Sequence, residues 1–219
     1  NYIKYLKLWL ITLFLLIIMM VAVGGLTRLT DSGLSITAWE LFTGILPPLN
    51  INEWNSYFTE YKKIPEYKNI NYGMTLAEFK VIFYWEYAHR VLARFIGLFT
   101  LIPLIIFNLK FKNTQYYSNK YYWIFLLVCL QGFVGWYMVS SGLIENNDVS
   151  HFRLSIHLSL ALFILCLIFW FILTIFKTKK FEFKFPNFLL LFILILIILQ
   201  IILGAFLSGL DGGLIYNSW

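Results

Sequence analysis

The residues best suited to chemistry lie in one stretch, residues 83–94, which reads FYWEYAHRVLAR and sits inside a long apolar run. The stretch holds an acid, a histidine and two arginines: Glu86, His89, Arg90 and Arg94. An ionisable group inside a membrane span is energetically expensive and is by default a functional candidate. On a helix these positions are three or four residues apart, so they share one face. One helix therefore offers a carboxylate, an imidazole and two guanidinium groups along a single stripe.

A second histidine, His157, lies in a later apolar run, one helical turn after Arg153. A helix rises 1.5 Å per residue, so His89 lies ~12 Å into the membrane if its helix enters near Val81. His157 lies ~10 Å in if its helix enters at Ser150, which puts both imidazoles at one depth. We therefore predict a haem pocket in which the two histidines ligate the iron from opposite faces. Arginines nearer the surface would pair with the propionates.

Other interpretations of these residues stay open. Each histidine alone could be a buried imidazole with a hydrogen-bond partner, such as Glu86 for His89. Glu86 could likewise form an i,i+4 ion pair with Arg90. Alternatively, its carboxylate could act as a catalytic acid–base or cation-stabilising group beside an oxidised substrate carbon. His151 falls on a different helix face from His157 and is expected to lie at an interface.

The composition indicates a membrane protein. Of 219 residues, 60% are hydrophobic and only 13% are charged, against about 25% charged residues in a soluble domain. Mean hydropathy is +0.76, and several runs approach the ~20 apolar residues that cross a bilayer. The net charge of +6 does not indicate a nucleic-acid partner, because the lysines gather in short segments between apolar runs. Cys129 and Cys166 are interpreted as small buried hydrophobes.

The apolar runs predict an all-α fold: a polytopic membrane four-helix bundle, a fifth transmembrane helix and a long extracytoplasmic loop containing short helices. Thr75–Glu78 reads as a capping box that starts the second span. Asn52 is expected to cap a short helix through residue 63 that lies on the membrane surface. The expected spans are 8–26, 81–108, 121–143, 151–176 and 187–207, and the long loop is 28–78.

The distribution of charge predicts the orientation of these spans. Lysines mark the N-terminal tail and segments 110–120 and 177–184, which the positive-inside rule places on the cytoplasmic or matrix side. The long loop and segment 144–150 then lie outside. All four arginines fall at or near the outer side, and guanidinium groups favour planar anions such as carboxylates. The candidate anion-binding residues are therefore Arg28, Arg90, Arg94 and Arg153.

The chain also contains a weak internal repeat. A shift of 180 residues aligns 21–39 with 201–219, with identities that include Asp31/Asp211 and Trp39/Trp219. The fifth span thus resembles the first span of a second unit. We expect residues 1–186 to form one four-helix unit and residues 187–219 to begin a truncated second one.

Several motifs give the chain a resemblance to the haem A synthase family. They follow the family's order and spacing over nearly the whole sequence. The matching stretches are GGLTRLTDSGLSITAW at 24–39, LPP at 46–48, EFK at 78–80, WEYAHR at 85–90, LQG at 130–132, GW at 135–136, SGL at 141–143, VS at 149–150, RL at 153–154, HL at 157–158, GAF at 204–206 and YNSW at 216–219.

The resemblance implies a protein of two pseudo-symmetric four-helix halves that oxidises the C8 methyl group of haem O to the formyl group of haem A. It implies that the first half holds the substrate haem and the second half a haem B cofactor. His89 and His157 would ligate the substrate haem, and Glu86 would lie near the reacting methyl group. The chain lacks the second half's histidine pair, so it is expected to be inactive alone.

The same resemblance implies an inner membrane of bacteria or mitochondria as the location, with the N-terminus on the cytoplasmic or matrix side. It implies haem O and the lipid bilayer as partners, not nucleic acid. Haem O synthase, cytochrome oxidase assembly factors and a second copy of the chain are further candidate partners. Two other functions stay open: a bis-histidine b-type cytochrome that only transfers electrons, and a haem or quinol carrier.

The predicted orientation can be tested by labelling single cysteines from either side of the membrane. A cysteine at Asn55 should react with an impermeant reagent from outside, and one at Lys112 only from inside. Labelling of position 112 from outside would reverse the orientation of the pocket.

Overall fold

The computed structural model describes residues 2–39, 44–110, 115–144, 147–176 and 186–215. Within these ranges the regular structure is helical and no strand is present. Five helices are long and apolar enough to cross a membrane, which confirms the predicted all-α polytopic class. The helices are α1 (Tyr2–Leu29), α2 (Ile51–Tyr61), α3 (Pro65–Asn69), α4 (Leu76–Lys110), α5 (Gln115–Val139), α6 (His151–Phe176), α7 (Asn187–Gly209) and α8 (Gly212–Ile215).

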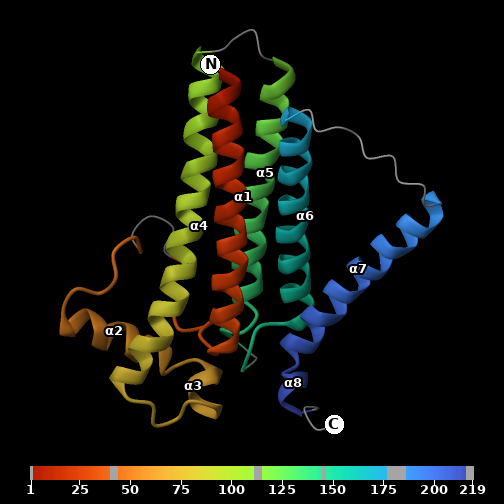
Figure 1. The fold of residues 1–219 in the computed structure, drawn as a ribbon. Coiled ribbons are helices and arrows are strands. Elements are labelled where there is room, and N and C mark those ends of the chain that lie inside the picture. The colour runs from red at the N-terminus through yellow and green to blue at the C-terminus, as the bar shows by residue number, and fades with distance from the viewer. Residues whose placement is uncertain (1, 40–43, 111–114, 145–146, 177–185, 216–219) are drawn as a thin grey trace.

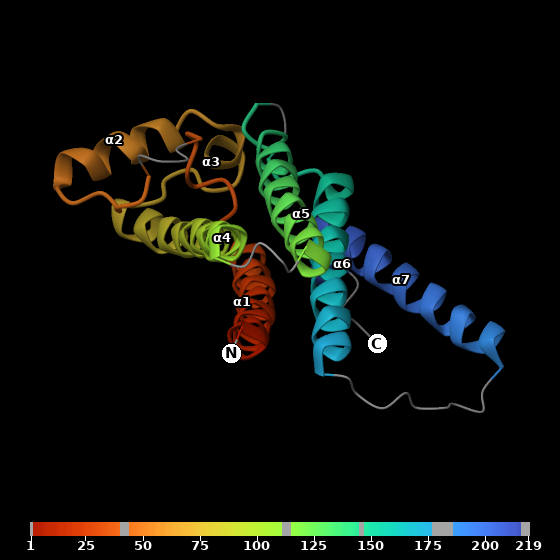
Figure 2. The same ribbon diagram turned by 90° about the horizontal axis from the view of Figure 1, so that it is seen from above.

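Four of the long helices form one bundle (Figure 1). Helix α1 packs against α4 and α6, and α5 packs against the same two helices. Seen along the bundle, α4 and α6 therefore lie on one diagonal and α1 and α5 on the other (Figure 2). The helices that carry His89 and His157 thus face each other across the bundle. Position 112 and the lysine-rich segment 177–184 lie outside the described residues.

The start of α4 is fixed by the predicted capping box. The Thr75 backbone N–H donates to Glu78 Oε2 over 2.8 Å, and the Glu78 N–H donates to Thr75 Oγ1 over 3.3 Å. Two otherwise unpaired N–H groups are satisfied in this way. The cap of α2 differs from the prediction, because Asn50, not Asn52, accepts from the Glu53 N–H at 2.9 Å. Asn50 has the extended backbone that a cap requires, whereas Asn52 is already helical.

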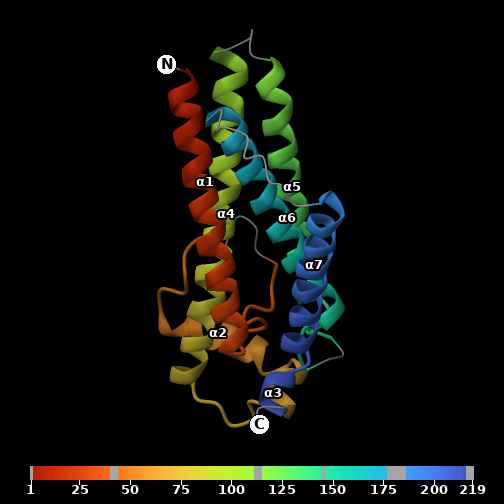
Figure 3. The same ribbon diagram turned by 45° about the vertical axis from the view of Figure 1, so that its right-hand side comes forward.

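Helices α2 and α3 fold onto the start of α4, and we call this end of the bundle the loop end (Figure 3). Trp54 and Phe58 of α2 pack against Phe79 of α4, with ring centroids 6.5 and 4.9 Å from it. Trp54 also lies 4.9 Å from Phe83. This aromatic cluster anchors the loop on the helix that carries the chemically interesting stretch.

Helix α7 is attached mainly at the loop end. There, the His151 ring of α6 lies 5.7 Å from Phe206, and Gly209 lets α7 approach the His151 backbone. The opposite part of α7 runs away from the bundle (Figures 1 and 2), and residues 190–200 are exposed. His151, the first residue of α6, therefore lies at the contact between α6 and α7. Cys129 and Cys166 are exposed, not buried as predicted, because they lie on outward helix faces where apolar residues meet lipid.

A buried carboxyl group lies beneath the α2–α3 turn. Glu66 accepts a hydrogen bond from the Tyr61 hydroxyl at 3.1 Å and from the Asn71 amide at 3.3 Å. Its second oxygen is buried and has no partner in the described part of the chain. Burial raises the pKa of Glu66 to about 8, and it also raises the pKa of Tyr61 well above its usual range. Glu66 is therefore held mainly as the neutral acid at neutral pH.

The pKa of Glu66 predicts a pH-dependent loop. Because the folded-state value of about 8 exceeds the ordinary 4.5, its stabilising contribution is full below pH 4.5 and is lost as the pH rises through 8. Glu66→Gln should therefore stabilise the α2–α3 region at pH 9 by about 1–3 kcal/mol and leave it nearly unchanged at pH 4. Hydrogen exchange over residues 51–71 measures this, with the exposed Glu60→Gln as control. Equal effects of the Glu66 substitution at both pH values would contradict it.

Candidate functional site

The bundle interior contains a level at which the side chains of its helices are only partly buried. Toward the end opposite the loop, residues such as Leu13, Ile96 and Ile168 form a continuous buried core. Toward the loop end, the aromatic cluster is separately buried. Between them, a stretch of about ten residues, ~15 Å of helix, has no buried residue in the described chain. This level lies between Ile17 and Thr27 on α1, Glu86 and Ile96 on α4, Ser155 and Ile164 on α6, and after Ile124 on α5.

Both predicted ligand histidines lie within this level. His89 is in contact with Gly24 of α1, where an added Cβ would approach His89 Cε1 to 2.8 Å. Helices α1 and α6 are antiparallel with Phe14 beside Phe169. If the pairing of Phe14 with Phe169 is continued along the two helices, Gly24 lies opposite a position two residues from His157. The two residues then differ in height along the bundle by ~3 Å. The two histidines therefore sit at nearly the same height on facing helices.

The two imidazoles have different surroundings. The Nδ1 atom of His89 is buried without a hydrogen-bond partner in the described residues. His157 lies against α5, where an added Cβ on Gly135 would come within 3.0 Å of its Cε1. The Gln131 amide nitrogen lies 3.2 Å from His157 Nδ1 and 3.3 Å from Nε2. A glycine on a neighbouring helix thus makes room for each ring.

Glu86 is buried, and both of its carboxylate oxygens have partners. Oε1 accepts from Arg90, with contacts of 2.9 Å to Nε and 2.7 Å to the terminal nitrogen. Oε2 accepts from the Ser35 hydroxyl at 2.7 Å and from the Ile36 backbone N–H at 2.8 Å. The ion-pair interpretation of Glu86 is therefore realised in the structure. The pair also holds the segment that follows α1.

Arg90 fixes that segment further. Its guanidinium donates to the Ile36 carbonyl at 2.8 Å and to the Ala38 carbonyl at 3.0 Å. Trp39 then reaches α5, where its ring lies 6.3 Å from Trp136. Figures 1 and 2 show α4 and α5 moving apart toward the loop end, and the Ser35–Trp39 segment bridges them there.

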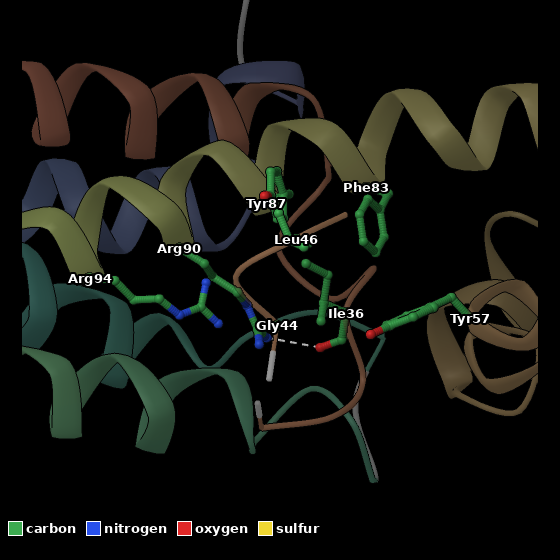
Figure 4. Close-up of a pocket in the computed structure, with 8 residues that line it drawn as sticks. All are labelled: Ile36, Gly44, Leu46, Tyr57, Phe83, Tyr87, Arg90 and Arg94. Atoms are coloured by element: carbon green, nitrogen blue, oxygen red, sulfur yellow. Dashed lines mark hydrogen bonds between the residues drawn. The ribbon is translucent and has the colours of Figure 1, made fainter. Parts of the chain in front are cut away.

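A small pocket lies beside this segment, between α2, α4 and the loop (Figure 4). Arg90 and Arg94 extend side by side from α4 into it, and the Arg90–Ile36 hydrogen bond crosses it. Apolar and aromatic side chains, including Phe83 and Tyr57, form its other walls. The pocket has room for little more than a water molecule, and neither histidine is among its lining residues.

The other two predicted arginines are engaged elsewhere. Arg153 donates to the Tyr137 carbonyl at 2.7 Å, and its guanidinium lies over the Tyr137 ring at 3.8 Å. Arg28 forms ion pairs with three aspartates on three segments. These partners are Asp31 at 3.0 Å, Asp148 at 2.9 Å and Asp211 at 2.6 Å.

Sequence reasoning missed the neutral residues of the site. Ser35 and Ile36 hold Glu86, and Gln131 contacts His157, but none carries a charge or a motif that points to these contacts. For Gln131, the one available signal is a polar amide inside an apolar span.

Comparison with known proteins identifies the family. The family model described as cytochrome oxidase assembly protein, COX15-CtaA, matches residues 7–219. The chain is 86% identical over its full length to a protein named heme A synthase from Pelagibacter ubique, of which it covers 65%. It is 46% identical over 99% of its length to heme A synthase from Rickettsia bellii, of which it covers 66%. It is also 45% identical over 96% of its length to heme A synthase from Bradyrhizobium diazoefficiens, of which it covers 59%.

The chain thus spans about two thirds of the length of the curated relatives it matches. No solved structure matches it. The family match extends over nearly every described residue and includes both histidines, Glu86 and the segment that holds it. The chain therefore belongs to the haem A synthase (COX15-CtaA) family of cytochrome oxidase assembly proteins.

Proposed function

We propose that this chain forms the substrate-binding half of a haem A synthase, an oxidoreductase that converts the C8 methyl group of haem O to the formyl group of haem A. The observation that carries the proposal is that His89 and His157 lie at nearly one height on facing helices, at a level where the helices have no fully buried residue in the described chain. Two metal-ligand side chains placed in this way are the arrangement that a planar ligand bound through its metal requires.

The residues present fit an iron porphyrin. Neutral imidazoles are common ligands of haem iron. His89 Nδ1 has no partner in the described chain, and the rings of His89 and His157 occupy the room that Gly24 and Gly135 leave. His89 and His157 would hold the iron of haem O, which supplies the oxidisable methyl group when bound. We also propose that the second half of such a protein holds a haem B cofactor.

The arginines would orient the substrate. Arg90 and Arg94 follow His89 on α4, in the direction away from the loop end, and their side chains line the pocket beside Ile36. We propose that they pair with the propionates. Arg153 lies one turn from His157 on α6 and is a further candidate for that role. Arg28 is a weaker candidate, because three aspartates already surround its guanidinium.

Glu86 is proposed as the acid–base group near the reacting carbon. Its carboxylate lies one helical turn from His89 and is held in place by Arg90, Ser35 and Ile36. Release of one of these hydrogen bonds would let the carboxylate accept a proton while Arg90 stays beside it.

The chain is a multi-pass membrane protein. We further propose a bacterial inner membrane, with the N-terminus of α1 in the cytoplasm and the loop end outside. Haem O synthase and cytochrome oxidase assembly factors are the proposed partners, because one would deliver haem O and the others would receive haem A.

The two-histidine site can be tested in the full-length protein co-expressed with haem O synthase. His89→Ala and His157→Ala should each lose the haem of the first half and should stop conversion of haem O to haem A. His151→Ala is the matched control, because His151 packs against α7, and it should retain both. Extraction and chromatography of the haems provide the measurement. Undiminished haem content and haem A in both alanine variants would contradict the proposed site.

The role of Glu86 can be tested with Glu86→Gln, which keeps the shape and the hydrogen bonding of the side chain and removes its charge. We expect bound haem to remain and haem A formation to fall by about 10²-fold or more. Spectroscopic haem content and extracted product are measured on the same sample. Loss of haem together with increased proteolysis near Ser35 would instead assign Glu86 a purely structural role.

A further inference from the structure

The side chain of Gln131, on α5, contacts three atoms of His157, and the sequence did not indicate this contact. Its amide nitrogen donates to the His157 backbone carbonyl over 3.0 Å. The same nitrogen lies within 3.3 Å of both ring nitrogens of that histidine. The amide group is therefore held beside the imidazole by a backbone hydrogen bond that does not depend on how the ring is turned.

The hydrogen bonds of the fold do not account for the side-chain oxygen of Gln131. Gln131 Oε1 is buried and has no hydrogen-bond partner within the described residues. Buried acceptors without a partner are uncommon in native proteins, and each calls for an explanation. The imidazole of His157, which lies beside the same amide group, could supply a donor.

A histidine that ligates a metal through one ring nitrogen carries a proton on the other. That N–H usually donates to a carbonyl, a carboxylate or water, which fixes the ring and raises its basicity. The final torsion of a histidine side chain is soft, so the ring of His157 can turn while its backbone stays fixed. A turn of this kind would bring its N–H to the Gln131 oxygen.

We propose that Gln131 is a positioning residue for the His157 ligand, whose side-chain oxygen accepts a hydrogen bond from His157 Nδ1–H when Nε2 binds the haem iron. This inference rests on the proposed function. Gln131 then makes His157 the more strongly donating ligand of the pair. His89 has only Gly24 at the corresponding place, and its Nδ1 lacks a partner in the described chain.

The inference can be tested by the reduction potential of the first-half haem in the full-length protein. That haem is the component of the redox titration that disappears in His157→Ala and in His89→Ala. Gln131→Met keeps the size of the side chain and removes the oxygen acceptor. A weaker donor ligand stabilises ferric iron less, so the potential should rise and the low-spin ferric EPR signal should shift.

Two further variants keep the test decisive. Gln131→Glu retains an oxygen acceptor and should hold the potential at or below that of the wild type. Gln131→Asn withdraws the amide by one methylene group and should raise the potential, even if the methionine variant fails to bind haem. Gln200→Leu on the exposed part of α7 is the matched control and should leave the potential unchanged.

The outcomes separate this inference from the proposed function. If Gln131 only ties α5 to α6, the methionine variant will lose stability but keep the potential of its bound haem, and the inference is wrong. The same holds if the methionine and glutamate variants shift the potential in the same direction. If the two histidine variants retain every haem, the first-half site itself is wrong.

Discussion

The buried ion pair between Glu86 and Arg90 is the interaction on which the loop end depends. Burying two charges is expensive unless each remaining lone pair and proton is also satisfied. Here the carboxylate accepts from Ser35 and Ile36 as well, and the guanidinium donates to two carbonyl groups of the same segment. The pair therefore fixes the course of Ser35–Trp39, and through Trp39 it connects α4 to α5.

That connection joins two helices at the loop end, beyond the level at which the side chains are only partly buried. The apolar core at one end and the aromatic cluster at the other fix the helices above and below the histidines. The level between them does not have to contribute packing energy of its own. Both ends of the bundle are therefore fixed independently of the side chains that lie between them.

The long helices and the shared height of the histidines could be predicted because they follow from local rules. Hydropathy marks a span, a capping box marks its start, and the helix rise then sets the depth of His89. The hydrogen bonds of the site could not be predicted in this way. Those of Arg90 end on backbone carbonyls of a distant segment, and a backbone carbonyl leaves no trace in the sequence. The cap of α2 moved to Asn50 for a related reason, since two nearby asparagines can both supply a cap.

Arg28 was predicted as an anion-binding residue from its type and its place in the chain. The sequence could not show that three aspartates already neutralise its guanidinium. Asp31 and Asp211 occupy equivalent positions of the internal repeat, and both adopt a positive φ, of 46° and 52°. Both then bind the one guanidinium that lies between the ends of α1 and α7. Because position 208 is a serine, Arg28 has no counterpart in the repeat, and it serves both aspartates alone. Its charge is thus used to hold α7 against the bundle at the loop end, which leaves Arg90, Arg94 and Arg153 as the arginines nearest the two histidines.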